Sequence, residues 1–131
     1  MTDHRHPDGE MTLRVIPMPA DLNAAGDVFG GWVMSQMDVG SSVLACRRAQ
    51  GRVATVAVDS MHFVRPVQVG DIFNTYCRIV REGRTSVTIN VEAWVERQGT
   101  FEMERVTEAD FTFVALDENG RPKPLPEESR T

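Results

Sequence analysis

With 131 residues, 41% of them hydrophobic, the chain can build the core of one ordinary domain and is too short for two. Its net charge of -5 disfavours nucleic acid and anionic membranes as partners, so a polyanionic ligand would need a local basic site. No stretch reaches the roughly 18 apolar residues of a membrane span. Cys46 and Cys77 lack paired or metal-type spacing, and the N-terminus is polar. These features together predict a cytoplasmic protein.

Both ends of the chain are polar and are expected to lie outside the folded domain. Residues 1–11 and 118–131 are predicted to be flexible tails, because they contain too little apolar material to pack, and residues 12–117 are predicted to form the domain. Within it, the stretch TLRVI at residues 12–16 is typical of a short strand, and the prolines that follow it end the strand.

A helix is predicted over residues 31–50. Val33, Met37 and Leu44 recur there at helical spacing, two arginines occupy the last turn, and a glycine follows at the position expected to end the helix. One acid, Asp38, stands among these apolar positions.

Four longer strands are predicted after the helix, at residues 53–65, 72–82, 85–97 and 103–116. The first is apolar on both alternating sides, so it needs cover on both faces. In the third, apolar and polar residues alternate strictly, which is typical of a half-buried antiparallel strand. The turns between the strands predict that all four follow one another in a meander.

This order of elements predicts an α+β fold, in which one long helix packs against a curved antiparallel sheet of about five strands. A helix of about 18 residues cannot cover both faces of such a sheet, so we expect the sheet to curl around the helix. Association with a second copy would cover the remaining apolar surface.

Familiar catalytic signatures are largely absent. The sequence has no G-x-S-x-G, no H-E-x-x-H and no phosphate-binding glycine loop, which argues against a serine hydrolase, a zinc enzyme and a nucleotide-binding protein. The three histidines, His4, His6 and His62, do not form a set of metal ligands, so no metal site is predicted.

The start of the predicted helix is the strongest candidate for chemistry. Gly30 and Gly31 stand there, and their backbone amides are suited to bind an anion or an oxyanion. Asp38 follows by about two turns, on nearly the same face but about 10 Å along the axis. If two copies paired with antiparallel helices, the glycines of one copy would approach Asp38 of the other, and the active site would belong to the dimer.

Each of these residues also has a purely structural interpretation. Asp38 could face solvent or bond to a neighbouring strand, and the two glycines could simply begin the helix. Asp27 fits an N-cap or turn residue, and Asn23 fits a turn residue. His62 fits a core or interface position better than a general base. Close packing beneath a sheet explains the small residues of the helix, which are Gly40, Ser41, Ser42 and Ala45.

Three stretches together resemble a known family. They are NAAGDVFGGWVMSQMD, then GRVATVAVDSMHFVRPVQVGD, then GRTSVTINVEAWVE, and over residues 13–117 the sequence resembles the bacterial acyl-CoA thioesterases of the YciA type. The resemblance implies the hotdog fold, a long helix wrapped by a curved antiparallel sheet, with dimers formed through edge strands and assembled further into tetramers or hexamers. It also implies an enzyme that hydrolyses acyl-CoA to a carboxylic acid and CoA without a cofactor.

Position by position, the resemblance implies roles for the residues of the helix and its preceding loop. Asp38 would be the catalytic carboxylate, and the backbone amides of Gly30 and Gly31 would bind the oxyanion. Asn23 and Asp27 would line the same pocket.

The resemblance also implies contacts with the rest of the substrate. In the GRTS segment, Arg84 would meet a phosphate of CoA, and Thr85 and Ser86 would supply hydrogen bonds. Thr55 and Val56 would border the acyl or pantetheine channel. Without the resemblance, Arg84 would be an ordinary exposed hairpin arginine.

Two positions depart from the family pattern. His62 stands where relatives carry an asparagine, and Leu22 stands where they carry a threonine. Both positions lie close to the expected pocket, so both bear on the preferred acyl chain.

Hydrolysis of a thioester needs little machinery, because a thiolate departs without first being protonated. One carboxylate and an oxyanion hole are therefore sufficient, with Asp38 acting either as general base or as nucleophile. Two alternatives keep the fold: a non-catalytic acyl-CoA-binding sensor, and a hydratase or dehydratase, for which His62 is the only ordered histidine. A purely structural oligomerisation module is the third.

Overall fold

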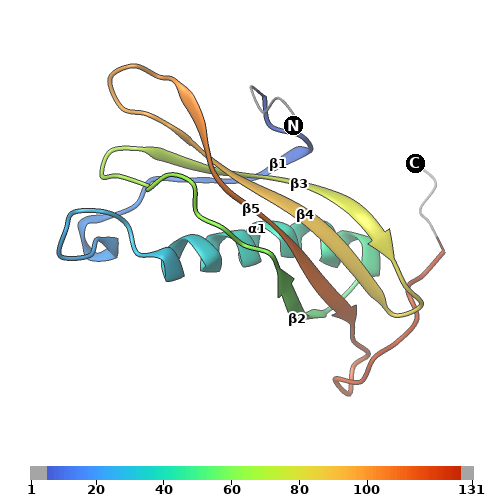
Figure 1. Cartoon of the computed structure of the whole chain (residues 1–131). Coiled ribbons are helices and arrows are strands. Elements are labelled where there is room, and N and C mark those ends of the chain that lie inside the picture. Colours follow the sequence, from blue (N-terminus) through green and yellow to red (C-terminus); the bar gives the residue numbers. More distant parts are fainter. Residues whose placement is uncertain (1–5, 128–131) are drawn as a thin grey trace.

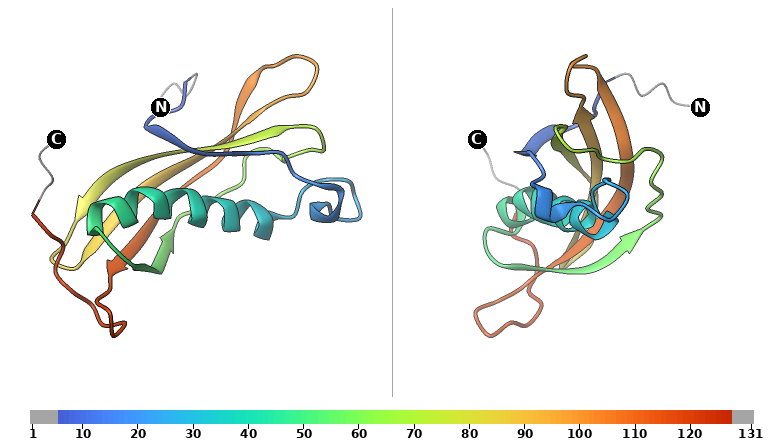
Figure 2. Two further views of the ribbon diagram at one scale, coloured as in Figure 1. Left: turned by 180° about the vertical axis from the view of Figure 1, so that it is seen from behind. Right: turned by 90° about the vertical axis from the view of Figure 1, so that its left-hand side faces the viewer.

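One long helix packs against a five-stranded antiparallel sheet in the computed structural model, which describes residues 6–127 (Figure 1). The predicted α+β fold is confirmed. The sheet curves around the helix, which lies along its concave side (Figure 2). In chain order the elements are β1 (Glu10–Val15), the short 3-10 helix η1 (Pro19–Asp21), α1 (Gly30–Ala49), β2 (Val53–Asp59), β3 (Ile72–Glu82), β4 (Ser86–Glu96) and β5 (Met103–Ala115).

The described part of the chain contains no helix that is both long and apolar enough to span a membrane. Residues 1–5 of the predicted N-terminal tail, with His4, lie outside the described residues. β1 begins at Glu10, inside that predicted tail.

The strand order across the sheet is β1-β3-β4-β5-β2. β3, β4 and β5 form a meander, but β2 pairs with β5 at the far edge, so the predicted meander of four strands is wrong. β2 also ends at Asp59 rather than at residue 65, because Ser60 has a left-handed backbone with φ of 56° that interrupts the extended chain. Residues 60–71 then cross to β3 without long regular structure.

α1 approaches the sheet through small residues. Gly40 is buried, and a Cβ added there would collide with the hydroxyl of Thr75 on β3. Ser41 and Ala45 are fully buried, whereas Ser42 is half-buried. The predicted close packing beneath the sheet is therefore confirmed for all but Ser42.

β4 is the central strand and is buried on both faces along nearly its whole length. The prediction of a half-buried strand is therefore wrong for its polar side, which the neighbouring side chains cover. Asn90 Nδ2 donates to Glu108 Oε2 (2.9 Å) and Asp110 Oδ1 (3.0 Å). Trp94 Nε1 donates to Glu92 Oε1 (2.8 Å). Alternation identifies which residues share a face, but long side chains on adjacent strands decide whether that face is covered.

Apolar side chains at the free edge of the sheet have little cover within one chain. On β2, Val56 is 58% exposed and Val58 is 39% exposed. Phe63 and Val64, just beyond the strand, are 46% and 55% exposed. The sequence predicts that apolar residues on both faces of this region are covered, but a single chain leaves several of them exposed.

The C-terminal segment packs against the domain within the described residues. Leu125 contacts the core, and its backbone N–H donates to Arg84 O (2.9 Å). Lys123 N donates to Ala115 O (2.9 Å). The expectation that this segment has too little apolar material to pack is wrong for residues 118–127, because one leucine, backbone hydrogen bonds and a bond from Arg48 Nη1 to Pro126 O (2.7 Å) hold it.

Candidate active site

Asp38 and Thr55 are brought together by the fold. Asp38 is half-buried on α1, and its Oδ1 accepts a hydrogen bond from Thr55 Oγ1 on β2 (2.5 Å). Among the described residues, the other carboxylate oxygen of Asp38 has no hydrogen-bond partner. The carboxylate is therefore oriented by one oxygen while the second stays available to a substrate or water.

The N-terminus of α1 is open. The N-cap is Phe29, which makes no side-chain capping bond, so an N-cap role for Asp27 is wrong. Trp32 N is the first amide that bonds to Phe29 O (3.1 Å), and no acceptor for the amides of Gly30 and Gly31 occurs in residues 6–127. These two amides meet the requirement for an anion or oxyanion site.

An added side chain would meet different neighbours at Gly30 and at Gly31. A Cβ at Gly30 would lie 3.6 Å from the Phe63 ring, whereas a Cβ at Gly31 would meet no atom of the described residues within 4 Å. Gly30 therefore lies against the Phe63 side chain, and Gly31 faces open space.

Asn23 shapes the loop before the helix. Its Oδ1 accepts from Ala25 N (2.9 Å) and Asp27 N (3.1 Å), and its N–H donates to Asp27 O (2.7 Å). The turn interpretation of Asn23 and Asp27 is thus confirmed, while a role in lining the pocket stays a prediction. Backbone pairing of Asp27 with Gln68, and of Val28 N with Val67 O (2.9 Å), joins this loop to residues 60–71.

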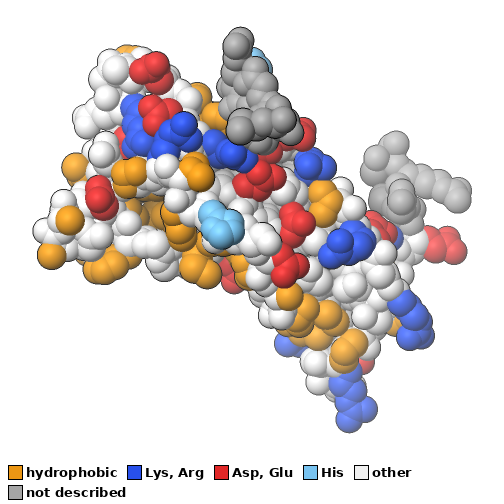
Figure 3. All heavy atoms as spheres, in the orientation of Figure 1, with side chains coloured by type: hydrophobic (Ala, Val, Ile, Leu, Met, Phe, Trp, Pro, Cys, Tyr) orange, Lys and Arg blue, Asp and Glu red, His pale blue; other side chains and the backbone are white. Residues whose placement is uncertain are grey.

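An apolar cleft of about 290 Å³ lies between the start of α1 and residues 60–71. Figure 3 shows hydrophobic side chains gathered at this end of the molecule. Asp38 does not line the cleft, since it lies two turns further along α1. The lining residues are Val28, Gly30, Val33, Phe63, Val64, Arg65, Pro66, Val67 and Val106.

The predicted CoA contacts lie at the opposite end of the helix. Arg84 and Thr85 form the turn between β3 and β4, and Ser86 begins β4. Arg48 in the last turn of α1 bonds to Glu82 beside this turn (2.8 Å), whereas Gly30 stands at the other end of this 20-residue helix. Such a helix is about 30 Å long. One chain therefore does not bring the two groups together (Figure 1).

The two remaining candidates of the sequence are exposed. Val56 lies on the free edge strand β2. His62 lies in the irregular segment after β2, so a core position is wrong, and an interface position stays a prediction. The His62 carbonyl accepts a hydrogen bond from Thr107 Oγ1 (2.7 Å). In the part of the chain that the structure describes, no three His, Cys, Asp or Glu side chains are arranged to hold a metal ion.

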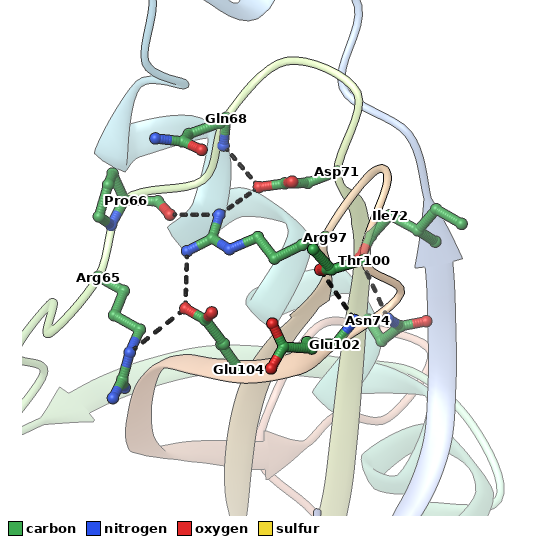
Figure 4. A network of polar contacts seen from close by, with 10 residues as sticks. All are labelled: Arg65, Pro66, Gln68, Asp71, Ile72, Asn74, Arg97, Thr100, Glu102 and Glu104. Atoms are coloured by element: carbon green, nitrogen blue, oxygen red, sulfur yellow. Dashed lines mark hydrogen bonds and ion pairs between the residues drawn. The ribbon is translucent and has the colours of Figure 1, made fainter.

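Sequence reasoning missed the ionic cluster behind the cleft. Arg97 Nη1 donates to Asp71 Oδ2 (2.5 Å), and Arg97 Nη2 donates to Glu104 Oε1 (3.1 Å) (Figure 4). The only local signal was Asp71 in the turn VGD, which the sequence assigns to a simple turn.

Residues 25–102 match the family described as the thioesterase superfamily. The acyl-CoA thioester hydrolase YciA of Escherichia coli is 50% identical over 130 residues, which cover 97% of this chain and 98% of that protein.

Solved structures agree with this match. A hexameric thioesterase from Yersinia pestis is 51% identical, with a TM-score of 0.89 over 94% of this chain and 100% of that one. A hexameric hotdog fold thioesterase of Campylobacter jejuni is 37% identical, with a TM-score of 0.86 over 91% of this chain and 92% of that one. This chain therefore belongs to the thioesterase superfamily and, within it, to the hotdog-fold acyl-CoA thioester hydrolases of the YciA type.

Proposed function

We propose that this protein is an enzyme that hydrolyses acyl-CoA to a free carboxylic acid and CoA, with Asp38 as its catalytic carboxylate. One observation carries the proposal: a half-buried carboxylate with one free oxygen stands on the same helix as two amides, and residues 6–127 supply no acceptor for these amides and no donor for that oxygen. The first group suits attack on a carbonyl, and the second suits the oxyanion that forms during that attack.

The chemistry follows from the leaving group. The amides of Gly30 and Gly31 hold the thioester oxygen as it becomes negative, and the dipole of α1 adds positive potential there. Asp38 activates a water molecule or attacks the carbonyl directly, and the CoA thiolate leaves without a proton donor. Hydrolysis in oxygen-18 water tests direct attack, because label enters the Asp38 carboxylate only when water opens an acyl anhydride at the Asp38 carbonyl.

We propose that two chains complete each site. Asp38 and Gly31 are seven residues apart on one rigid helix, which is about 10 Å and too far for one carbonyl to contact both. Antiparallel pairing of two helices would bring Asp38 of one chain to the glycines of its partner. Exposed Val56 and Val58 support pairing through β2, and the similar proteins of known structure are hexameric, which favours further assembly.

The remaining residues are proposed to hold the substrate. Arg84 is exposed, has no ionic partner among residues 6–127, and would bind a CoA phosphate, with Thr85 and Ser86 as hydrogen-bond donors. Thr55 and Val56 would border the pantetheine or acyl channel. Asn23 and Asp27 would line the pocket beside the glycines.

No cofactor besides the CoA of the substrate is proposed, because the carboxylate and the amides suffice for hydrolysis. We place the reaction in the cytoplasm, since Cys46 and Cys77 are both free thiols, which suits a reducing compartment.

Release of free CoA from acetyl-, butyryl-, hexanoyl- and palmitoyl-CoA tests the proposal. We expect the wild type to release CoA and a folded Asp38→Asn variant to be at least about 100-fold slower, because an amide can neither accept the proton nor attack. Asp8→Asn changes an exposed acid that pairs with Arg78 and should leave the rate unchanged. No release from any acyl-CoA by the wild type, with binding retained, would favour the sensor.

A further inference from the structure

The wall of the apolar cleft is an irregular segment. Residues 63–67 contribute five of its lining residues, yet they lie between β2 and β3 in neither a helix nor a strand. A segment of this kind has no repeating ladder of backbone bonds to fix its position. Its placement therefore depends on individual contacts.

Two of those contacts come from one guanidinium. Arg97, just after β4, donates through Nη1 to Asp71 Oδ2 (2.5 Å) and to Pro66 O (3.2 Å). Its Nη2 donates to Glu104 Oε1 (3.1 Å) on β5. The side chain of Asp71 is 3% exposed and that of Arg97 is 15% exposed. Arg97 thus connects both ends of the stretch 66–71 to the rigid sheet (Figure 4).

Three further contacts extend this attachment to the substrate side. Arg65 lines the cleft, and its Nε lies 3.5 Å from the same Glu104 oxygen. Gln68 N donates to Asp71 Oδ2 (2.8 Å), and Val67 O accepts from Val28 N (2.9 Å), two residues before Gly30. A movement of Arg97 would therefore shift the wall, and with it the loop that leads into the oxyanion site.

A buried ion pair of this kind is a poor source of stability, because desolvation of both charges offsets their attraction. It is well suited to positioning, since the planar fork of an arginine fixes several acceptors in one geometry. The acceptors of Arg97 come from both ends of the stretch 66–71 and from the strand β5.

We infer that Arg97 is a positioning residue that sets acyl-chain selectivity by fixing the cleft wall. This inference rests on the proposed function, because a carbonyl held at Gly30 would direct its acyl chain into the cleft that Gly30 lines. A two-carbon acyl group would barely enter the cleft, whereas a six-carbon group would bury its methylenes there. Loss of Arg97 should therefore weaken binding of the longer chain selectively.

The test measures equilibrium binding of the non-hydrolysable thioethers S-ethyl-CoA and S-hexyl-CoA by calorimetry on the assembled protein. We expect the wild type to bind S-hexyl-CoA more tightly than S-ethyl-CoA. In Arg97→Met the ratio of these two affinities should fall at least about tenfold, while the affinity for S-ethyl-CoA changes little. Arg97→Lys keeps the charge and is the safer variant for folding. Its ratio of affinities should fall about threefold, because an ammonium is a point charge without the planar fork.

Arg14→Met is the matched control. Arg14 pairs with Glu96, the neighbour of Arg97 in the chain, but lies on β1 and does not line the cleft. The inference would be overturned if the ratio of affinities stayed within twofold of the wild type in Arg97→Lys and in any folded Arg97→Met. It would also be overturned if both thioethers lost affinity equally. A wild type with no preference would overturn it as well. A wild type that binds both thioethers but releases no CoA from acyl-CoA would instead overturn only the proposed hydrolysis.

Discussion

At the scale of single residues, the hydrogen bond from Thr55 to Asp38 is the most informative contact of the site. The sequence indicated Asp38 as an acid among apolar helical positions, and the resemblance placed Thr55 near the substrate. Their bond joins α1 to β2, two elements whose relative placement no local pattern contains. Individual groups of the site were therefore predictable, but their contact was not.

Removing that hydroxyl should impair catalysis without removing the carboxylate. We expect Thr55→Val to lower kcat/KM for butyryl-CoA about tenfold, since a hydrogen bond to a charged group contributes about 1.5–3 kcal/mol. Thr55→Ser should keep most of the activity. Thr112→Val, which breaks a bond between Thr88 and Thr112 on the adjacent strand β5, should leave kcat/KM unchanged. Equal rates for Thr55→Val and the wild type would exclude an orienting role for Thr55.

Cys77 makes stability depend on pH in alkaline solution. Burial raises the pKa of its thiol from an ordinary 9.0 to about 11, against an opposing hydrogen bond with Thr12. Between those values the folded chain retains a proton that the unfolded chain has lost, so the free energy of unfolding falls as pH rises from 9 to 11.

Chemical unfolding at pH 8 and pH 11 measures this effect. The wild type should lose about 2 kcal/mol more than Cys77→Val over that interval, because valine has no proton to lose. Parallel losses in both proteins would show that other groups dominate the alkaline transition.

At the scale of elements, β3 was predicted with its observed bounds, and α1 differs by one residue at each end. β2 was predicted too long because its apolar run continues past Ser60, whose backbone turns out of the strand. The order of strands was also wrong, because an apolar, β-branched strand fits either edge of a sheet. Residues 60–71, which carry β2 away from β3, give no periodic signal.

The helix is held close to the sheet by the missing side chain of Gly40. We expect Gly40→Ala to lower the free energy of unfolding by about 1–3 kcal/mol, because the new methyl group overlaps the hydroxyl of Thr75. Gly31→Ala places the same methyl group on the same helix at a point where no atom of residues 6–127 lies within 4 Å, so it should not destabilise the fold. Equal unfolding midpoints for the two variants in urea would contradict this close packing.

At the scale of the whole molecule, the exposed apolar edge at β2 accounts for the expected association. Val58→Lys introduces a charge at this edge and should reduce both the mass in sedimentation equilibrium and the hydrolytic rate, because each proposed site needs two chains. Val80→Lys is the control, since Val80 on β3 is 38% exposed and Val58 is 39% exposed. Dissociated chains with full activity would contradict the shared site.

Both halves of the proposed site, Asp38 and Gly31, stand on one rigid helix, whose rise per residue is fixed. No loop movement can alter the spacing between Asp38 and Gly31 within a chain. The distance between the carboxylate and the oxyanion is instead set by how the α1 helices of two chains align. A slip of one helical turn, about 5.4 Å, would separate the two groups. Alignment of the partners must therefore be preserved, while the walls around the acyl group remain free to vary.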